Sequence, residues 1–196
     1  MPVAIEIPQE AVALPHKLWT RDECEQLERI GMVDVNRYEL IEGELIHKMS
    51  KNSPHMLCVV LLCGWLQDVF GRLFVVPEPT IDVRPEDNPT SAPEPDAIVL
   101  TRSLRGMVGR PRPQEIRLLA EVSSTTLPFD LATKSKLYAR SGIVEYWVLD
   151  LDGGRLIVHR DPGGGIYRSV QAYGENEFVT CLAAPDHEVR VGELLR

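Results

Sequence analysis

The sequence lacks the cysteine patterns that build metal clusters and disulfide frameworks. None of its four cysteines belongs to a Cys-x-x-Cys pair. Zinc clusters and small disulfide-bonded scaffolds both depend on closely spaced cysteines. We therefore expect the cysteines of this chain to be buried, apolar thiols.

A secretory leader and a long apolar run are also missing. The first ten residues, MPVAIEIPQE, hold no basic segment and no apolar core of leader length. The longest apolar run, Met56 to Leu66, is interrupted by Gly64 and is shorter than the roughly 20 residues that span a bilayer. We expect a cytoplasmic protein without a membrane segment.

An excess of positive charge is absent as well. The chain has 21 Lys and Arg against 29 Asp and Glu, a net charge of -8, which argues against a protein that coats nucleic acid non-specifically. One segment, residues 102–117, is nevertheless rich in arginine, has Glu115 as its only acid, and is broken by glycines and prolines. It is either a solvated loop or a loop that contacts phosphates. The candidate phosphate contacts are Arg102, Arg105, Arg110 and Arg112.

The composition suits one globular domain. The chain has 196 residues, of which 44% are hydrophobic and 26% are charged, enough for a single well-packed core. We expect an arm over residues 1–17 and one domain over residues 18–196.

Helical and strand patterns alternate along that domain. Helices are predicted at 20–30, 53–70 and 130–141, and a hairpin at 38–49. Further strands are predicted at 73–76, 80–84, 96–100, 116–122, 145–150 and 155–160, with outer strands within 166–180. This order indicates an α/β or α+β domain built on a mixed sheet, with additional strands at the C-terminal end.

Local signals support these boundaries. Thr20 and Glu23 form a capping box for the first helix. Ser53 is the predicted cap of the second, with a proline in its first turn. Asp130 is predicted to cap the third helix, and Glu42-Gly43 is the predicted tight turn of the hairpin.

The stretch from residue 116 to 146 contains two charges where packing would favour apolar residues. Glu121 ends a hydrophobic strand. At about 100° per residue, Lys134 lies on the same side of the following helix as Leu137 and Tyr138, opposite Lys136. A lysine and a glutamate that both face inward indicate a site, because neither charge is buried cheaply without a partner.

Asp96 adds a second carboxylate at the start of a neighbouring strand. Two carboxylates at adjacent strand ends can hold Mg²⁺, and a nearby lysine can orient an attacking water or stabilise the transition state. This is the minimum equipment for hydrolysis of a phosphodiester bond. The alternatives are that Asp96 caps a turn and that Lys134 pairs with Asp130 along the helix.

The order Pro95-Asp96, then Glu121, then lysine resembles the PD-(D/E)xK nuclease superfamily. More closely, the chain is similar to the Uma family of endonucleases (Uma-two, once a domain of unknown function). The matching motifs lie between about residues 20 and 160 and are YELIEGEL (38–45), Ser53-Pro54-His55, Glu94-Pro95-Asp96, Glu121-Val122-Ser123-Ser124, Asp130 with Lys134 and Tyr138, and GIVEYWVLD (142–150).

The resemblance implies a restriction-endonuclease-like fold in which Asp96 and Glu121 bind Mg²⁺, or alternatively Mn²⁺. It also implies that Lys134 is the catalytic lysine, supplied by the helix. The superfamily lysine usually lies two residues after the acid, and Ser123 occupies that position in this chain.

Three further residues are weighed on the same basis. Glu44 is the candidate auxiliary acid, with Glu42 as its competitor. His55 either contacts phosphate or water or is a structural histidine.

The resemblance implies a DNA substrate, and analogy with enzymes of this fold predicts a homodimer. Two alternatives stand beside the endonuclease. One is a catalytically silent nuclease-fold protein that binds nucleic acid or a protein partner, and the other is a hydrolase of small phosphate esters.

Overall fold

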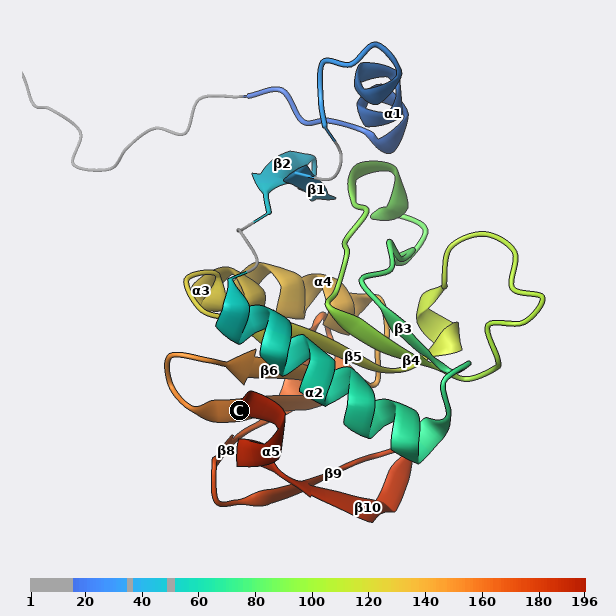
Figure 1. Ribbon diagram of the computed structural model, residues 1–196. Helices are drawn as coiled ribbons and strands as arrows, with labels where there is room; N and C mark the ends of the chain where they lie inside the picture. The colour runs from blue at the N-terminus through green and yellow to red at the C-terminus, as the bar shows by residue number, and fades with distance from the viewer. Residues whose placement is uncertain (1–15, 35–36, 49–51) are drawn as a thin grey trace, which may run out of the picture.

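The computed structural model of the chain describes residues 16–34, 37–48 and 52–196. The predicted arm over residues 1–17 therefore lies almost entirely outside the described residues. Within them, the structure has the predicted mixed α/β architecture, with one large sheet between helical layers (Figure 1).

The large sheet has six strands in the order β3-β4-β5-β6-β7-β8. They are β3 (Val75–Pro77), β4 (Ala97–Leu100), β5 (Ile116–Ser123), β6 (Glu145–Asp150), β7 (Arg155–Gly163) and β8 (Ile166–Gly174). β5 and β6 run parallel, and all other neighbours are antiparallel. A parallel pair needs a crossover connection, and here the helical segment 127–140 supplies it.

Two short hairpins flank this sheet. β1 (Tyr38–Ile41) pairs with β2 (Glu44–His47), and β9 (Phe178–Cys181) pairs with β10 (Ala184–Arg190). The predicted turn of the first hairpin is confirmed, because Glu42 and Gly43 both have positive φ angles, of 52° and 85°. Two consecutive positive φ angles are typical of the tight turns whose twist matches that of the flanking strands.

The helices lie between and around these strands. They are α1 (Arg21–Arg29), α2 (Ser53–Phe70), η2 (Asn88–Thr90), η3 (Pro113–Glu115), α3 (Leu127–Phe129), η4 (Asp130–Lys134), α4 (Ser135–Arg140) and α5 (Val191–Leu195). η2 and η3 are 3₁₀ turns, whereas η4 is a π-helical turn that joins α3 to α4 without a break.

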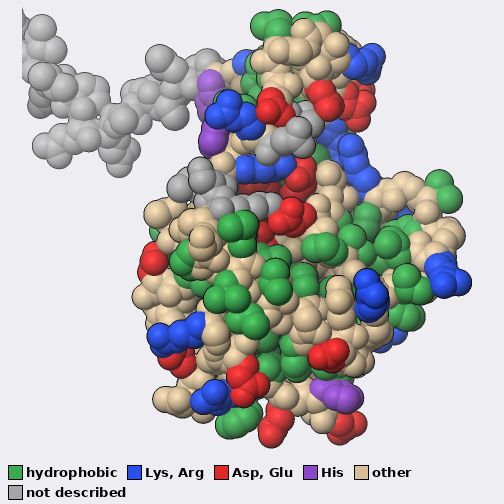
Figure 2. Space-filling model, viewed as in Figure 1, with side chains coloured by type: hydrophobic (Ala, Val, Ile, Leu, Met, Phe, Trp, Pro, Cys, Tyr) green, Lys and Arg blue, Asp and Glu red, His purple; other side chains and the backbone are tan. Residues whose placement is uncertain are grey.

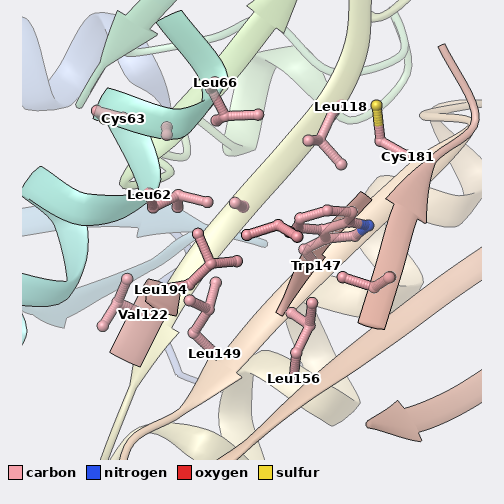
Figure 3. Packing of buried hydrophobic residues seen from close by; sticks show 14 of the residues in the cluster. Leu62, Cys63, Leu66, Leu118, Val122, Trp147, Leu149, Leu156, Cys181 and Leu194 are labelled. Carbon is pink, nitrogen blue, oxygen red and sulfur yellow. The ribbon is translucent and has the colours of Figure 1, made fainter. Parts of the chain in front are cut away.

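The hydrophobic core has one layer on each face of the sheet. α2 and α5 pack on one face, where Leu62 and Leu66 meet Trp147 and Leu149 (Figure 3). The other face is covered by α4 through a separate cluster that includes Tyr138. β5 separates the two layers as its alternation predicts, so Glu121 is directed towards α4.

α2 is longer than the apolar run that the sequence shows. Its 18 residues have a mean hydropathy of 1.3, enough by length and composition alone to cross a membrane. One side of the helix is nevertheless buried against the sheet through Cys58, Leu62, Cys63 and Leu66, which is the packing of a core helix.

Three local predictions were wrong. Asn52, not Ser53, caps α2, and its side chain accepts a hydrogen bond of 3.0 Å from the backbone N–H of His55. Asp130 does not cap a helix, because the helical segment already begins at Leu127. Residues 80–84 form an irregular segment instead of a strand.

Arg21 in the first helix makes several hydrogen bonds to the body of the protein. α1 begins with the predicted capping box of Thr20 and Glu23. Arg21 then donates hydrogen bonds to Asp82 Oδ1 at 2.7 Å and to the carbonyl of Ser91 at 2.6 Å. These bonds fix α1 against the segment that leads into β4.

Candidate active site

Lys134 is the centre of a buried charge cluster. Its side chain is only 6% exposed, and Nζ lies 2.9 Å from Glu39 Oε1 and 3.0 Å from Glu121 Oε1. Nζ also lies 3.7 Å from Asp130 Oδ1. The predicted inward orientation of Lys134 is confirmed, and the alternative pairing with Asp130 is only the longest of its three contacts.

The π-helical turn carries two members of this cluster. η4 begins at Asp130 and ends at Lys134, and the backbone N–H of Ser135 bonds to the carbonyl of Asp130, five residues earlier. π-turns are rare and occur frequently at functional sites. Here the turn lets both charged side chains point to the same side while Tyr138 still packs in the core.

Glu121 comes from β5 and is buried beside Lys134. Its Oε1 atom accepts hydrogen bonds from Lys134 Nζ at 3.0 Å and from the hydroxyl of Tyr138 at 2.9 Å. Burial raises the pKa of Glu121 well above its ordinary value; Lys134 opposes this shift, and the charges of Asp130 and Asp96 add to it. Within the described part of the chain, Oε2 accepts no hydrogen bond.

Asp96 lies directly before β4 and is bonded to the neighbouring strand. Its Oδ2 atom accepts a hydrogen bond of 2.7 Å from the backbone N–H of Val122, the residue after Glu121. Its Oδ1 atom lies 3.4 Å from Nε2 of His55 in the first turn of α2. The carboxylate therefore joins two strands and does not cap a turn of its own.

Glu39 was missed by the sequence analysis. It lies on β1, is 8% exposed, and contacts Lys134 through Oε1 while Oε2 accepts a bond of 3.3 Å from the backbone N–H of Glu94. Alternation along β1 could have identified it, since Glu39 shares a strand face with Ile41, which packs against Leu137.

The predicted auxiliary acid lies elsewhere. The side chain of Glu44 is 55% exposed and lies 3.2 Å from His16 Nε2. Its competitor Glu42 forms an ion pair with Arg140 on the surface. Neither carboxylate lines the cavity that Glu39 and Glu121 border.

Ser123 holds one acid of the charge cluster, Asp130, by a hydrogen bond. The residue is fully buried, and its hydroxyl donates a short hydrogen bond to Asp130 Oδ2. Burial raises the pKa of Asp130; Lys134 and the Ser123 hydroxyl both oppose that shift. In this structure Ser123 therefore orients an acid from a position that does not line the cavity.

One cavity of about 190 Å³ is bordered by the side chains of Glu39, Asp96, Glu121, Asp130 and Lys134. Its carboxylates outnumber its lysines, and Lys48 is paired with Glu94 at 2.6 Å. The polar lining consists of Glu39, Glu78, Glu94, Asp96, Glu121, Asp130, Lys48, Lys134, His47, His55, Asn52, Ser124, Thr125 and Thr126.

His55 lines this cavity with one ring nitrogen close to an acid and the other buried. Nε2 faces Asp96, whereas Nδ1 is buried and has no hydrogen-bond partner among the described residues. A histidine that only supports the fold would be expected to satisfy both nitrogens.

The donor set suits a hard divalent cation bound partly through water. No three Asp, Glu, His or Cys side chains in the described ranges are gathered as a ready metal centre. Mg²⁺, however, usually keeps several waters and takes one or two protein carboxylates. Asp96 and Glu121 supply two such carboxylates, and the oxygen Oε2 of Glu121 has no competing hydrogen bond.

The arginine-rich loop does not reach the cavity. Arg102 and Arg112 both bind Glu115, with nitrogen to oxygen distances of 2.7 and 3.2 Å. Arg110 lies 3.8 Å from Glu25, and Arg105 is exposed. Two of the four predicted phosphate contacts are therefore paired with an acid of the same loop.

Comparisons with known proteins identify the fold and the family of this chain. The chain resembles the crystal structure of a putative nuclease belonging to DUF820 from Anabaena variabilis, with a TM-score of 0.67 and 16% identity over 90% of this chain and 97% of that chain. At this identity the likeness shows the fold. No curated protein matches the sequence. The Uma2 family, described as a putative restriction endonuclease, matches residues 21–192, and the chain therefore belongs to this family of nucleases.

Proposed function

We propose that the protein is a metal-dependent endonuclease that hydrolyses phosphodiester bonds of DNA. The observation that carries this proposal is the position of Lys134, buried between Glu39 and Glu121 at the wall of the cavity that Asp96 also lines. A lysine buried among carboxylates next to a polar cavity suits catalysis on a phosphate better than it suits stability alone.

Asp96 and Glu121 would hold the metal, with Mg²⁺ or Mn²⁺ as the expected ions. A bound ion of this kind supplies Lewis acidity and lowers the pKa of a coordinated water. The protein itself must orient both acids. The Val122 N–H and the Tyr138 hydroxyl do this by bonding to Asp96 and Glu121 respectively, and the Lys134 ammonium group opposes the rise in the pKa of Glu121 that burial causes.

Lys134 acts as a cation and hydrogen-bond donor, not as a base. Burial alone would lower the pKa of Lys134, but the charges of Glu121, Glu39 and Asp130 raise it well above its ordinary value. The ammonium group therefore stays protonated. It can orient an attacking water and stabilise negative charge that develops on the phosphate oxygens.

Glu39 has the role that the sequence analysis gave to Glu44. Its carboxylate fixes one side of the Lys134 ammonium group, while Glu121 fixes the other. His55 is the candidate for a contact to substrate or water, because it lines the cavity and its Nε2 atom lies 3.4 Å from Asp96. Arg105 is the first candidate for a contact to the DNA backbone, because Arg102 and Arg112 are bound to Glu115. Arg110 is the second, since its ion pair with Glu25 is long, at 3.8 Å.

A second function is favoured by one specific observation. Lys134 is paired with Glu39 and Glu121 within the protein itself, as in a purely structural cluster. A nuclease-fold protein that binds nucleic acid without cutting it would keep such a cluster. By analogy with enzymes of this fold, we also expect a homodimer.

Plasmid cleavage separates the two functions. Supercoiled plasmid incubated with the wild type and Mg²⁺ or Mn²⁺ is expected to become nicked or linear, and chelator is expected to prevent this. Asp96→Asn and Lys134→Met should abolish cleavage, whereas Glu44→Gln should leave it unchanged as a matched control. Cleavage that survives Asp96→Asn, or the absence of cleavage in the wild type with either ion, would contradict the proposal.

A further inference from the structure

α2 presents an uncovered apolar stripe on the side that faces away from the sheet. Val60 is 66% exposed at its centre, with Leu57 at 48% and Met56 at 51% beside it. Figure 2 shows hydrophobic side chains gathered over this helix, in the middle of the front face. Among the 18 residues of α2, Asp68 is the only Asp, Glu, Lys or Arg. Contiguous exposed apolar surface of this kind marks an interaction site.

The spacing of the stripe makes it complementary to itself. Ser53, Leu57, Val60, Gly64 and Asp68 recur every three or four residues and therefore lie on one face of the helix. If two copies cross antiparallel at Val60, Leu57 of one lies opposite Gly64 of the other. A side chain added at Gly64 would meet nothing within 4 Å, so this position is an open notch that can receive Leu57.

The charges of the stripe are complementary in the same arrangement. Antiparallel crossing at Val60 brings Asp68 of one copy to Ser53, in the first turn of the other α2. The N-terminus of a helix carries a partial positive charge, and a carboxylate placed near it is stabilised. In α2 the N–H groups of His55 and Met56 are bonded to Asn52, so this stabilisation comes from the helix dipole. A parallel arrangement would instead place the two Asp68 carboxylates together, where they repel each other.

We propose that the exposed face of α2 is the surface through which two copies of this chain associate, antiparallel and centred on Val60. The assembly also sets the distance between the two active sites, a step that rests on the proposed function. His55 lines the cavity and lies in the first turn of α2. At 1.5 Å per residue, the two copies of His55, each five residues from the centre at Val60, come roughly 15 Å apart along the helix direction, which suits two cuts in one duplex.

The mass of the protein in solution, by light scattering, tests the surface. The wild type is expected to be a dimer and Val60→Glu a monomer with an unchanged circular dichroism spectrum. Val170→Glu is the matched control, because Val170 is also exposed, at 53%, and lies on β8. A monomeric wild type, or a dimer that Val60→Glu leaves intact, would overturn the proposal.

Paired substitutions test the register. Gly64→Leu fills the notch and should dissociate the dimer, and addition of Leu57→Ala should restore it. Asp68→Lys should weaken association about tenfold. Under mild oxidation, Val60→Cys should form a covalent dimer, whereas Asp68→Cys should not; crosslinking by both would indicate parallel pairing and contradict the register.

Vesicle flotation tests the competing occupant, a lipid surface. The wild type should stay with the unbound protein when mixed with vesicles of neutral and anionic phospholipid. Flotation that Val60→Glu abolishes would assign the stripe to a membrane and overturn the proposal. None of these readouts depends on cleavage, so failure of the interface and failure of the nuclease function are distinguishable.

Discussion

The backbone N–H of Val122 donates a hydrogen bond of 2.7 Å to Oδ2 of Asp96, across the junction of β5 and β4. This bond brings the first acid of the site next to the strand that carries Glu121. Asp96 therefore joins the two strands, and we propose a second, separable role for it in the chemistry.

Substitution of Asp96 should separate these roles. Asp96→Asn keeps an oxygen for the Val122 N–H, so we expect loss of cleavage with little change in unfolding temperature. Asp96→Ala leaves that buried N–H without a partner and should also lower the free energy of unfolding by about 1–3 kcal/mol. Denaturant unfolding of both variants measures the difference. Equal stability of the two would mean that the Val122 bond contributes nothing.

Loss of Lys134 should destabilise the fold as well as abolish activity. Lys134→Met leaves Glu121 and Glu39 buried without their cation, which is expected to cost about 3–5 kcal/mol of unfolding free energy. The unpaired acids would have raised pKa values in the folded state, so protonation favours folding. The difference in unfolding free energy between the wild type and Lys134→Met, measured by urea unfolding, should therefore shrink as the pH falls from 8 to 5. A deficit that grows over this range would contradict the buried pairing.

Substitutions of Glu39 and Glu44 are expected to have different effects on the cleavage rate. Glu39→Gln removes the charge that holds one side of Lys134 and should reduce the cleavage rate at least tenfold. Glu44→Gln changes an exposed side chain and should leave the rate within twofold. Initial rates of plasmid nicking at equal protein concentration give the comparison. If Glu44→Gln were the more damaging change, the assignment of the auxiliary acid to Glu39 would be wrong.

The stability that Glu115 contributes to the arginine-rich loop should depend on pH. Hydrogen bonds from Arg112 and Arg102 lower the pKa of Glu115 from 4.5 to about 2. The stabilisation is fully present above pH 4.5 and is lost as the pH falls towards 2, because the folded state binds the proton less readily than the unfolded one. The unfolding temperature of the wild type should exceed that of Glu115→Gln at pH 7, and the difference should disappear near pH 2. A difference that is constant with pH would mean that the charge of Glu115 has no part in it.

Much of the site was predictable because charge placed on an apolar pattern is conspicuous. Glu121 and Lys134 interrupt a strand and a helix face that are otherwise hydrophobic, and the structure brings them within 3.0 Å of each other. The order of elements also predicted the mixed sheet. Asp96 needed the family resemblance, since an acid after a proline is equally common in turns.

What escaped prediction depends on contacts between distant segments. Glu39 pairs with a lysine almost a hundred positions away, and its own hairpin motif offered two other acids. The helix start at Leu127 was obscured because Asp130 has the residue type of a cap, although Pro128 in the first turn was an available signal. The helical period of the sequence does not reveal the π-turn, because the turn inserts one residue into an otherwise regular helix.

The crossover between the parallel strands β5 and β6 carries Lys134, while its partners come from β1 and β5. The Glu39–Lys134 pair requires closure of a long loop, whereas Glu121 lies 13 positions from Lys134. A fragment that lacks β1 would therefore lack the acid on one side of the Lys134 ammonium group. Catalytic competence should therefore appear and vanish together with the whole tertiary structure, so that denaturant curves followed by cleavage and by circular dichroism coincide.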